Sequence, residues 1–471
     1  MKYASGDGCH AGGDHLTATL TVRAGTPDAA LALLDFLDPG WDVTALPALL
    51  PGQQRLLIQL PNESDLHQLC RAAIRDRHVI GYTDRLWAMS AGGRITTQPR
   101  HPVRSADDLA LMCAPGTDRL ATAIAARPDL TADVTGRPNR VAVVGNGTAL
   151  PGLGPVSPLA ALPALEGKAA LLAQLAGIDA VPICLDAVHA DGVVAAVRAI
   201  APTFGAINLT GVAAPASCDI ERRLRYALDI PVYHDEQHGT PVAVLAALRN
   251  ALRVTGRQLQ TARVVVMGAG VTGIAVTRLL LHAGAHDVTV WTRHGVLGPH
   301  LHGLPPHTAW LATYTNPRRL RGGLEHALTA ADAVIGLSAA GLLNPALIAA
   351  MASPPIVFPL ARPEPEIRPD QLAGSSALVA ATGHGNPNQI SDLLAAPGVL
   401  RGLLNARAPH VTTTILLTAA DVLSGLIGDE LLGTRRLLPD VLHPPLVPTM
   451  AAAVAAVASS QRPAAADQFS L

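Results

Sequence analysis

Apolar and polar residues alternate over LTATLTV (16–22), and apolar residues recur at helical spacing in the following PDAALALLDFL. A period of two predicts a strand, and a spacing of three to four residues predicts a helix. The same pair recurs in RLLIQL and SDLHQLCRAAI, where Ser64 is a candidate helix cap, and HVIGYT would close a sheet. The pattern predicts a small ferredoxin-like α+β module over residues 15–90.

Strands and helices alternate again from about residue 105 onward. NRVAVVGNG, DAVPICLD and GAINLTG read as buried strands, with helical patterns such as KAALLAQLAG between them. This alternation is typical of an α/β fold with a parallel sheet. We place the domains at residues 91–245 and 246–440, followed by a C-terminal helix and tail over 441–471. Residues 1–14, rich in Gly, His and Asp, are expected to be disordered.

Composition narrows the classes of function. The formal net charge is −1, which gives no electrostatic case for nucleic acid or an anionic membrane. The five cysteines form no CxxC pair, so no disulfide framework or zinc site is indicated. The first residues lack the apolar core of a signal peptide, and no uninterrupted apolar run reaches the ~18 residues of a membrane helix. We expect a soluble, cytoplasmic protein.

A glycine-rich motif opens the second α/β unit. GAGVTG (268–273) follows the apolar run RVVVM and precedes the helical pattern IAVTRLLLHAG. In a dinucleotide site the first glycine permits the turn, the second admits the pyrophosphate and the third allows close packing. The candidate cofactor contacts are Gly268, Ala269, Gly270, Val271, Thr272 and Gly273.

The next strand, DVTVW, should end beside the adenosine ribose. An acidic residue there would bind the ribose hydroxyls of NAD, but this chain has Thr292 and Arg293, followed by His294. These residues would tolerate the 2′-phosphate of NADP, so the cofactor is NAD or NADP. Ser338, at the end of the strand pattern DAVIGLSA, is a further candidate contact.

Lys168 is singled out by composition. Of the 35 Lys and Arg residues only Lys2 and Lys168 are lysines, so arginine serves almost everywhere else. Arginine keeps its proton at working pH, whereas a desolvated lysine can exchange one. Lys168 is therefore a candidate proton-transferring residue.

The residues around Lys168 carry a family resemblance. The segment GNGTALPGLGPVSPLAALPALEGKAALLAQLAGIDAVPICLD resembles the corresponding stretch of bacterial malic enzymes, as do APTFGAINL, DIERRLRYALDIPVYHDEQHGTPVAVLAAL, FPLARPEPEI and PNQI. The resemblance runs from about Gly92 to about residue 425 in unbroken order. Residues 15–85 are similar in pattern to the ACT-type module found ahead of some such enzymes.

The resemblance implies an activity and a fold. Malic enzymes oxidise malate with NAD or NADP and release CO₂, using a divalent metal, on an α/β domain followed by a Rossmann-type domain. It also implies a small-molecule carboxylate as substrate or effector, and a homo-oligomer. By the same resemblance Lys168 and Asp235 belong to the proton-transfer network, and Cys113 stands where the family has its proton-donating Tyr.

The positions that bind metal and substrate depart from the family pattern. Thr210 and Gly211 replace two of three carboxylates, and Glu236 stands for the third. Because hard divalent cations prefer carboxylate oxygens, Glu236 could hold Mg or Mn only weakly. Arg362, Ser391 and Asp392 replace substrate-binding Asn residues, and Arg362 could pair with a carboxylate.

Three interpretations follow from these departures. The chain is an oxidoreductase that decarboxylates malate or a related 2-hydroxy acid, with activity impaired by its incomplete metal site. Alternatively, it is a catalytically silent dinucleotide-binding sensor or partner subunit. The third is a metal-independent dehydrogenase in which Arg362 supplies the missing positive charge.

Overall fold

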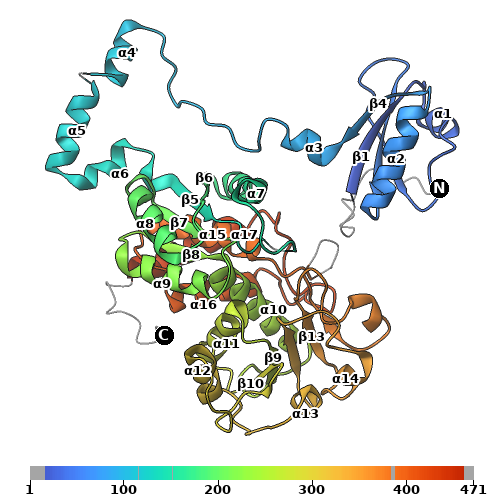
Figure 1. Cartoon of the computed structure of the whole chain (residues 1–471), viewed down its shortest axis with the longest axis vertical. Coiled ribbons are helices and arrows are strands. Elements are labelled where there is room, and N and C mark those ends of the chain that lie inside the picture. The colour runs from blue at the N-terminus through green and yellow to red at the C-terminus, as the bar shows by residue number, and fades with distance from the viewer. Residues whose placement is uncertain (1–15, 115, 151, 383–387, 461–471) are drawn as a thin grey trace. The chain divides into compact units, whose positions relative to one another are not determined.

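The structure is a computed structural model that describes residues 16–114, 116–150, 152–382 and 388–460. It divides into two compact units, one ending at Arg94 and the other beginning at Ile95 (Figure 1). The predicted disorder of residues 1–14 and of the tail from Pro463 lies outside the described residues.

The first unit contains one antiparallel sheet and three helices. Its strands are β1 (Leu16–Val22), β2 (Asp42–Leu46), β3 (Gln54–Leu60) and β4 (Val79–Asp84), and its helices are α1 (Pro27–Ala32), α2 (Glu63–Arg75) and α3 (Arg85–Ser90). The sheet order is β2-β3-β1-β4, and the elements follow one another as βαββαβ, with β2 the strand for which the sequence analysis gave no pattern. Alternate residues of β3 are buried, which agrees with its period-two pattern. The cap of α2 is Asn62, which accepts a hydrogen bond from Asp65 N, so the expectation for Ser64 is wrong.

The first sheet of the second unit has four parallel strands in the order β6-β5-β7-β8. The strands are β5 (Arg140–Gly145), β6 (Asp179–Cys184), β7 (Ala206–Leu209) and β8 (Val232–His234). The helices between and after them are α7 (Pro158–Ala176), α8 (Ala190–Ile200) and α9 (Ala216–Ala227). Because all four strands are parallel, the residues that follow β5, β7 and β8 meet at one edge of the sheet.

A six-stranded sheet follows, of order β11-β10-β9-β12-β13-β14. Its strands are β9 (Arg263–Met267), β10 (Asp287–Thr292), β11 (Gly295–Val296), β12 (Ala333–Gly336), β13 (Ile356–Pro359) and β14 (Leu378–Val379). Only the β10–β11 pair is antiparallel. The main helices are α11 (Val271–His282), α12 (Pro306–Tyr314), α13 (Leu324–Leu328) and α14 (Pro345–Ala349). The strand order reverses between β9 and β12, and such a switch point is where open α/β sheets bind ligands.

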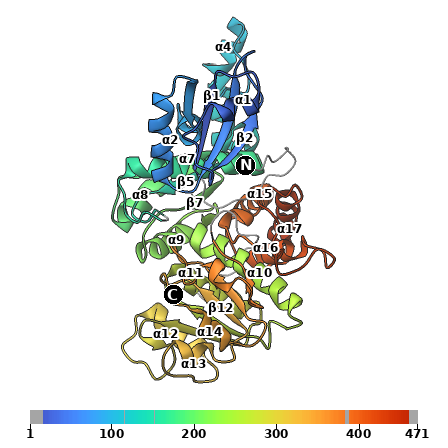
Figure 2. The ribbon, with the colours of Figure 1, turned by 90° about the vertical axis from the view of Figure 1, so that its right-hand side faces the viewer.

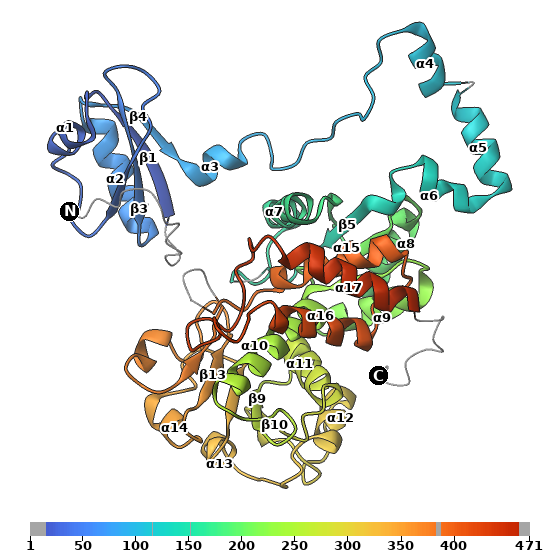
Figure 3. The same ribbon diagram turned by 180° about the vertical axis from the view of Figure 1, so that it is seen from behind.

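One hydrophobic core joins the two parallel sheets. The helix α10 (Thr240–Val254) is buried almost throughout and packs against α11 and α16 (Thr413–Gly425). The helices α15 (Ala396–Ala406) and α17 (Leu446–Ser460) pack against each other and against α7. Figure 2 and Figure 3 both show α15, α16 and α17 side by side. The C-terminal segment therefore returns to cover the helix that carries Lys168.

Two parts of the second unit differ from this core. The helices α4 (Ala106–Met112) and α5 (Gly116–Ala126) contain no buried residue among those described. The helix α7 is long and apolar enough to cross a membrane by length and composition alone. One face of α7 packs on β5, β6 and α15, and the helix carries the charged residues Glu166 and Lys168 midway.

Candidate active site

The glycines of GAGVTG have distinct geometric reasons to be glycine. Gly268 has φ +112°, and a Cβ there would lie 2.4 Å from Leu337 O. A Cβ on Gly273 would lie 2.2 Å from Gly268 O, so close packing of strand and helix requires glycine. A Cβ on Gly270 would meet nothing within 4 Å. Gly270 thus borders open space at the N-terminus of α11, where an anionic phosphate would be favoured.

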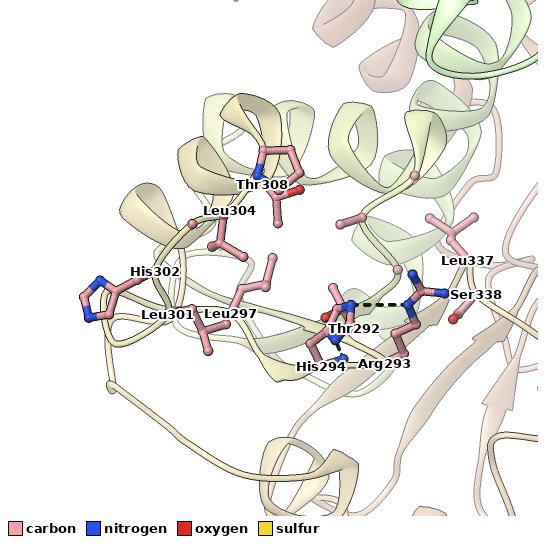
Figure 4. A pocket seen from close by; sticks show the side chains of 15 residues that line it. Thr292, Arg293, His294, Leu297, Leu301, His302, Leu304, Thr308, Leu337 and Ser338 are labelled. Carbon is pink, nitrogen blue, oxygen red and sulfur yellow. Dashed lines mark hydrogen bonds between the residues drawn. The ribbon is translucent and has the colours of Figure 1, made fainter.

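These glycines open onto a pocket of about 690 Å³. It lies at the carboxyl ends of β9, β10 and β12, and the loop before α12 forms its far wall (Figure 4). The lining residues are Gly268, Ala269, Gly270, Thr292, Arg293, His294, Leu297, Leu301, His302, Gly303, Leu304, Pro305, Thr308, Leu337 and Ser338. Val271 and Thr272 begin α11 behind them and are half-buried. The size and the position at the switch point suit a dinucleotide.

The charge of this pocket is positive at the end of β10. Arg293 Nε lies 3.3 Å from His294 Nε2, and the two side chains lie together in Figure 4. The Thr292 hydroxyl accepts from His294 N at 3.2 Å and so fixes this turn. None of the fifteen lining residues is acidic. The turn therefore lacks the carboxylate that would bind a free ribose 2′-hydroxyl.

Glu366, which the sequence interpretation missed, holds two strand ends beside the pocket. Its carboxylate is fully buried and accepts hydrogen bonds from Ser338 N at 2.9 Å and from Ala361 N at 3.0 Å. It thereby ties the residue after β12 to the residues after β13. Its place in the segment FPLARPEPEI, in the loop that follows a buried strand, was the available signal, since a buried glutamate needs hydrogen-bond partners.

Lys168 lies in a second cluster of polar residues. Its Nζ is 3.2 Å from Asp235 Oδ1 and also donates a hydrogen bond to Asp392 Oδ2. The Lys168 side chain is only 10 % exposed. Asp235 begins η4 (Asp235–Gly239), a single π-helical turn after β8, and Asp392 begins η6 (Asp392–Leu394). The structure thus brings together α7, the end of β8 and a turn more than 200 residues away.

The pKa of Lys168 is raised, whereas the sequence led us to expect a desolvated lysine that exchanges its proton easily. Burial by itself would lower the pKa of this amine, but the charges of Asp235 and Asp392 outweigh burial and raise it. The two carboxylates thus favour the ammonium form of Lys168, and its part in proton transfer stays a prediction. Burial raises the pKa of Asp235, whereas at Asp392 the Lys168 charge outweighs burial and lowers the pKa.

Two neighbours hold Asp235 in place. Asn208 Nδ2, at the end of β7, donates to Asp235 Oδ1 at 2.9 Å. The Thr210 side chain also hydrogen-bonds this carboxylate and favours its charged form. Asn208 was not predicted, although an amide inside the buried strand AINL was a usable signal. Thr210, which we had considered only as a lost metal ligand, supports the acid beside Lys168.

The donor set does not fit a divalent metal. Thr210 is engaged with Asp235, and Gly211 has no side chain and a φ of +63°. Glu236 Oε2 lies 3.1 Å from His234 Nδ1, and burial raises the pKa of Glu236 to about 7. Within the part of the chain that the structure describes, no group of three His, Cys, Asp or Glu side chains is placed to hold a metal. The described residues at these positions therefore form no site for Mg or Mn.

The histidines on either side of this segment are neutral. Burial lowers the pKa of His234 to about 4 and that of His238 to about 3. His238 Nδ1 accepts a hydrogen bond from His234 N at 2.9 Å. Both rings therefore serve the local fold of the turn.

The remaining predicted site residues lie around or away from Lys168. Cys113 is exposed at the end of α4, and none of the described hydrogen bonds or ion pairs joins it to the cluster. Ser391 caps η6 by accepting from Leu393 N. Arg362 is exposed, and its charge helps to lower the pKa of Asp392. Their contact with a substrate stays a prediction.

The two candidate sites share packed elements. The helix α11, which starts at the glycine motif, packs against η4, which carries Asp235. The turn η4 in turn packs against η6, which carries Asp392. The helix that follows the glycine motif is therefore linked through η4 to both carboxylates of the Lys168 cluster.

Comparison with family models matches most of the second unit. Residues 121–225 match the "malic enzyme, N-terminal domain" and residues 237–459 match the "malic enzyme, NAD binding domain". The first match ends within α9, and the second begins within η4, just before the helix α10.

Individual proteins resemble the chain over similar ranges. It is 41 % identical over 382 residues to an NAD-dependent malic enzyme of Geobacillus stearothermophilus, covering 81 % of this chain and 80 % of that one. It is 38 % identical over 368 residues to a bifunctional malic/malolactic enzyme of Bacillus subtilis, covering 78 % and 90 %. The crystal structure of an NAD-dependent malic enzyme from Thermotoga maritima superposes with a TM-score of 0.75 at 35 % identity, covering 80 % of this chain and 99 % of that one.

Proposed function

The chain belongs to the malic enzyme family, and we propose that it is an oxidoreductase that uses NAD or NADP to decarboxylate malate or a related 2-hydroxy acid oxidatively. The observation that carries the proposal is the Lys168–Asp235–Asp392 cluster, whose turn η4 packs against the helix α11 that follows the glycine-lined pocket. Oxidation of a 2-hydroxy acid needs these two parts together, a hydride acceptor and polar groups for the hydroxyl proton.

The residues of the pocket fit the cofactor. Gly268 and Gly270 would let the backbone approach the pyrophosphate, and the N-terminus of α11 would stabilise its charge. When bound, the nicotinamide supplies the acceptor for the hydride that leaves C2 of the substrate. Glu366 would hold the loops after β12 and β13 together at the edge of the pocket, and the Lys168 cluster would bind and orient the C2 hydroxyl.

A direct assay tests this function. The purified protein would be given malate with NAD or NADP, with Mn²⁺ or with a chelator, while reduced nucleotide and pyruvate are measured separately. We expect both products in equal amounts, at a slow rate, with the chelator present. Failure of both products with either nucleotide would contradict the proposal.

One observation favours a second candidate, a nucleotide-binding subunit without turnover. Thr210 and Gly211 stand where the family has carboxylates, and Lys168 is paired with two acids. In that case calorimetry would detect nucleotide binding, while the assay would detect no pyruvate under any of its conditions. Self-association, implied by the resemblance, stays a prediction that sedimentation velocity would test.

We expect NADP to bind more tightly than NAD, and Arg293→Ser to remove that difference. The guanidinium at the end of β10 would make charge-assisted hydrogen bonds with the 2′-phosphate, which NAD lacks. Loss of such a contact should weaken NADP binding about tenfold to a hundredfold and leave NAD binding unchanged. Titration calorimetry with each nucleotide measures both affinities.

The matched control for this prediction is Arg319→Ser, an exposed arginine on a loop whose side chain does not line the pocket. It should change neither affinity. Equal loss of NAD and NADP binding in Arg293→Ser would show instead that Arg293 supports the shape of the pocket.

Restoring the carboxylates tests the metal interpretation. The triple variant Thr210→Glu, Gly211→Asp, Glu236→Asp should bind Mn²⁺ at least tenfold more tightly than the natural chain, because three carboxylates would converge. The φ of +63° at Gly211 would cost about 1 kcal/mol of stability for a non-glycine residue. Calorimetry with Mn²⁺ is the measurement, with Glu236→Asp alone as control; no gain would mean that these positions do not share a pocket.

A further inference from the structure

We infer that Glu366 makes the dinucleotide pocket selective for the oxidised form of the nucleotide, because it holds a negative charge behind the part of the wall that faces the nicotinamide half. The inference rests on the proposed function and adds a specificity-determining residue to its cofactor site. The oxidised nicotinamide ring carries one positive charge, and the ring is neutral once it has accepted a hydride. A fixed negative charge near the ring therefore distinguishes the two forms.

The carboxylate of Glu366 lies one hydrogen bond behind the surface of the pocket. Ser338 lines the pocket, and its main-chain N donates to Glu366 Oε1 at 2.9 Å. The other oxygen, Oε2, accepts from Ala361 N at 3.0 Å. Glu366 is 0 % exposed, so its charge acts through protein and is screened less than a charge in water. A negative charge at this place acts on whatever binds beside Ser338.

The hydrogen bonds of Glu366 are those of an ionised carboxylate. The main-chain N–H groups of Ser338, Ala361, Leu360 and Glu366 itself favour its charged form. They oppose the effect of burial, which raises the pKa of this carboxyl. The carboxylate therefore lies in a nest of main-chain donors, which holds an anion without a cation.

No side-chain cation in the described part of the chain neutralises this charge. Within residues 16–114, 116–150, 152–382 and 388–460, none of the ion pairs involves Glu366, and main-chain donors alone favour its charged form. Arg368, two positions later, lies 3.3 Å from Asp370 instead. Arg362 is exposed. The negative charge of Glu366 is thus available to a positive group that binds in the pocket.

The last residue of β12 makes room for this carboxylate. A Cβ on Gly336 would lie 2.4 Å from Glu366 Cδ, so a side chain there would displace the acid. Gly336 is paired with Pro359, the last residue of β13. The carboxylate is therefore fixed against the ends of two neighbouring strands of the parallel sheet.

The strand order decides which half of the nucleotide meets this charge. In this type of fold the pyrophosphate binds at the helix that follows the first strand, here α11 after β9, and the adenosine ribose binds at the end of the next strand, here β10. The nicotinamide half then extends to the other side of β9, toward β12, where Leu337 and Ser338 line the pocket. Arg293 and the N-terminus of α11 act on the phosphates, which the oxidised and reduced forms share. Glu366 is thus placed to discriminate between the two forms, whereas these positive groups are not.

Titration calorimetry with the oxidised and the reduced nucleotide tests the inference without substrate or turnover. At about pH 8, where an acid of this kind is ionised, the natural chain should bind oxidised NADP at least about threefold more tightly than reduced NADP. The same preference should hold for the two forms of NAD. Equal affinities, or tighter binding of the reduced form, would overturn the inference and leave the proposed cofactor site in place. Failure of all four nucleotides to bind would overturn the inference and the proposed function together.

Two variants separate the charge of Glu366 from its part in holding the loops. Glu366→Gln removes the charge at nearly constant size, and should lower the ratio of oxidised to reduced affinity at least about threefold. Glu366→Asp keeps the charge on a shorter side chain, so it should weaken both forms by a similar factor and keep the ratio. Glu364→Gln, an exposed acid of the same loop, is the matched control and should change neither affinity.

The ratio of affinities distinguishes this role from a structural one. If Glu366 only held the loops after β12 and β13 together, both of its variants would weaken the two forms alike, and an unchanged ratio in Glu366→Gln would overturn the inference. Melting temperatures show whether each variant folds. If Glu366→Gln does not fold, the preference of the natural chain for the oxidised form decides the inference, since that measurement needs no variant.

Discussion

Gly270→Val is expected to abolish nucleotide binding while leaving the protein folded. A Cβ at this position meets no protein atom within 4 Å, and the backbone there is extended, which valine adopts readily. The added isopropyl group would occupy the space through which the pyrophosphate approaches the N-terminus of α11. We expect at least a hundredfold loss of affinity for both NAD and NADP, or about 2.7 kcal/mol, measured by titration calorimetry.

Two further glycine variants are controls for this prediction. Gly433→Val, in a loop with equally open space around its Cβ position, should leave nucleotide affinity and melting temperature unchanged. Gly273→Val should instead lower the melting temperature strongly, because its side chain would meet Gly268 O at 2.2 Å. If Gly270→Val bound nucleotide as tightly as the natural chain, the glycines of the motif would serve only the packing of β9 against α11.

Lys168→Met should reduce kcat about a thousandfold or more. The variant removes the interior cation of the cluster, and a fixed charge in a site with little water contributes several kcal/mol to a charged transition state. Substrate affinity should change less than kcat if the contact strengthens as charge develops on the C2 oxygen. Steady-state kinetics with the preferred nucleotide separates kcat from KM.

This variant also leaves Asp235 and Asp392 facing each other without a counter-charge, which will lower stability. The double variant Lys168→Met, Asp392→Asn removes one of those charges and should recover part of the lost melting temperature, but none of the lost kcat. Recovery of kcat together with stability would mean that Lys168 is structural.

The dinucleotide-binding half of the molecule was largely predictable from sequence. The run RVVVM followed by GAGVTG and an apolar helical pattern predicted a strand, a turn and a helix, and β9 and α11 confirm them. These signals are local, because strand, turn and helix form from neighbouring residues. The contact of these glycines with a nucleotide stays a prediction.

The Lys168 cluster was only partly predictable. Lys168 and Asp235 followed from the family resemblance, and their contact at 3.2 Å supports grouping them. The pairing of Lys168 with Asp392 spans 224 positions, and no local pattern reports a contact between a helix and a turn so far along the chain. For the same reason the sequence suggested a lysine that releases its proton, since burial can be inferred from a helix pattern but the charges facing it cannot.

Cys113 was predicted from a sequence match alone, and none of the described contacts joins it to the Lys168 cluster. Its position in the sequence matches the Tyr of the family, but α4 has no buried residue and its end is exposed. A motif match assigns a residue to an alignment column, whereas proton donation needs the group within hydrogen-bond distance of the reacting atom. Cys113 therefore stays a prediction without a contact to support it.

Malate that carries deuterium on C2 would show directly whether this protein oxidises the substrate. The protein, stripped of metal and supplied with NAD or NADP, should transfer the deuterium to the reduced nucleotide and release one pyruvate for each deuterium, as mass spectrometry would show. The same experiment with Lys168→Met should yield neither product within the same time. If the natural chain bound the nucleotide but transferred no deuterium to it, with or without Mn²⁺, the proposed oxidation would be contradicted.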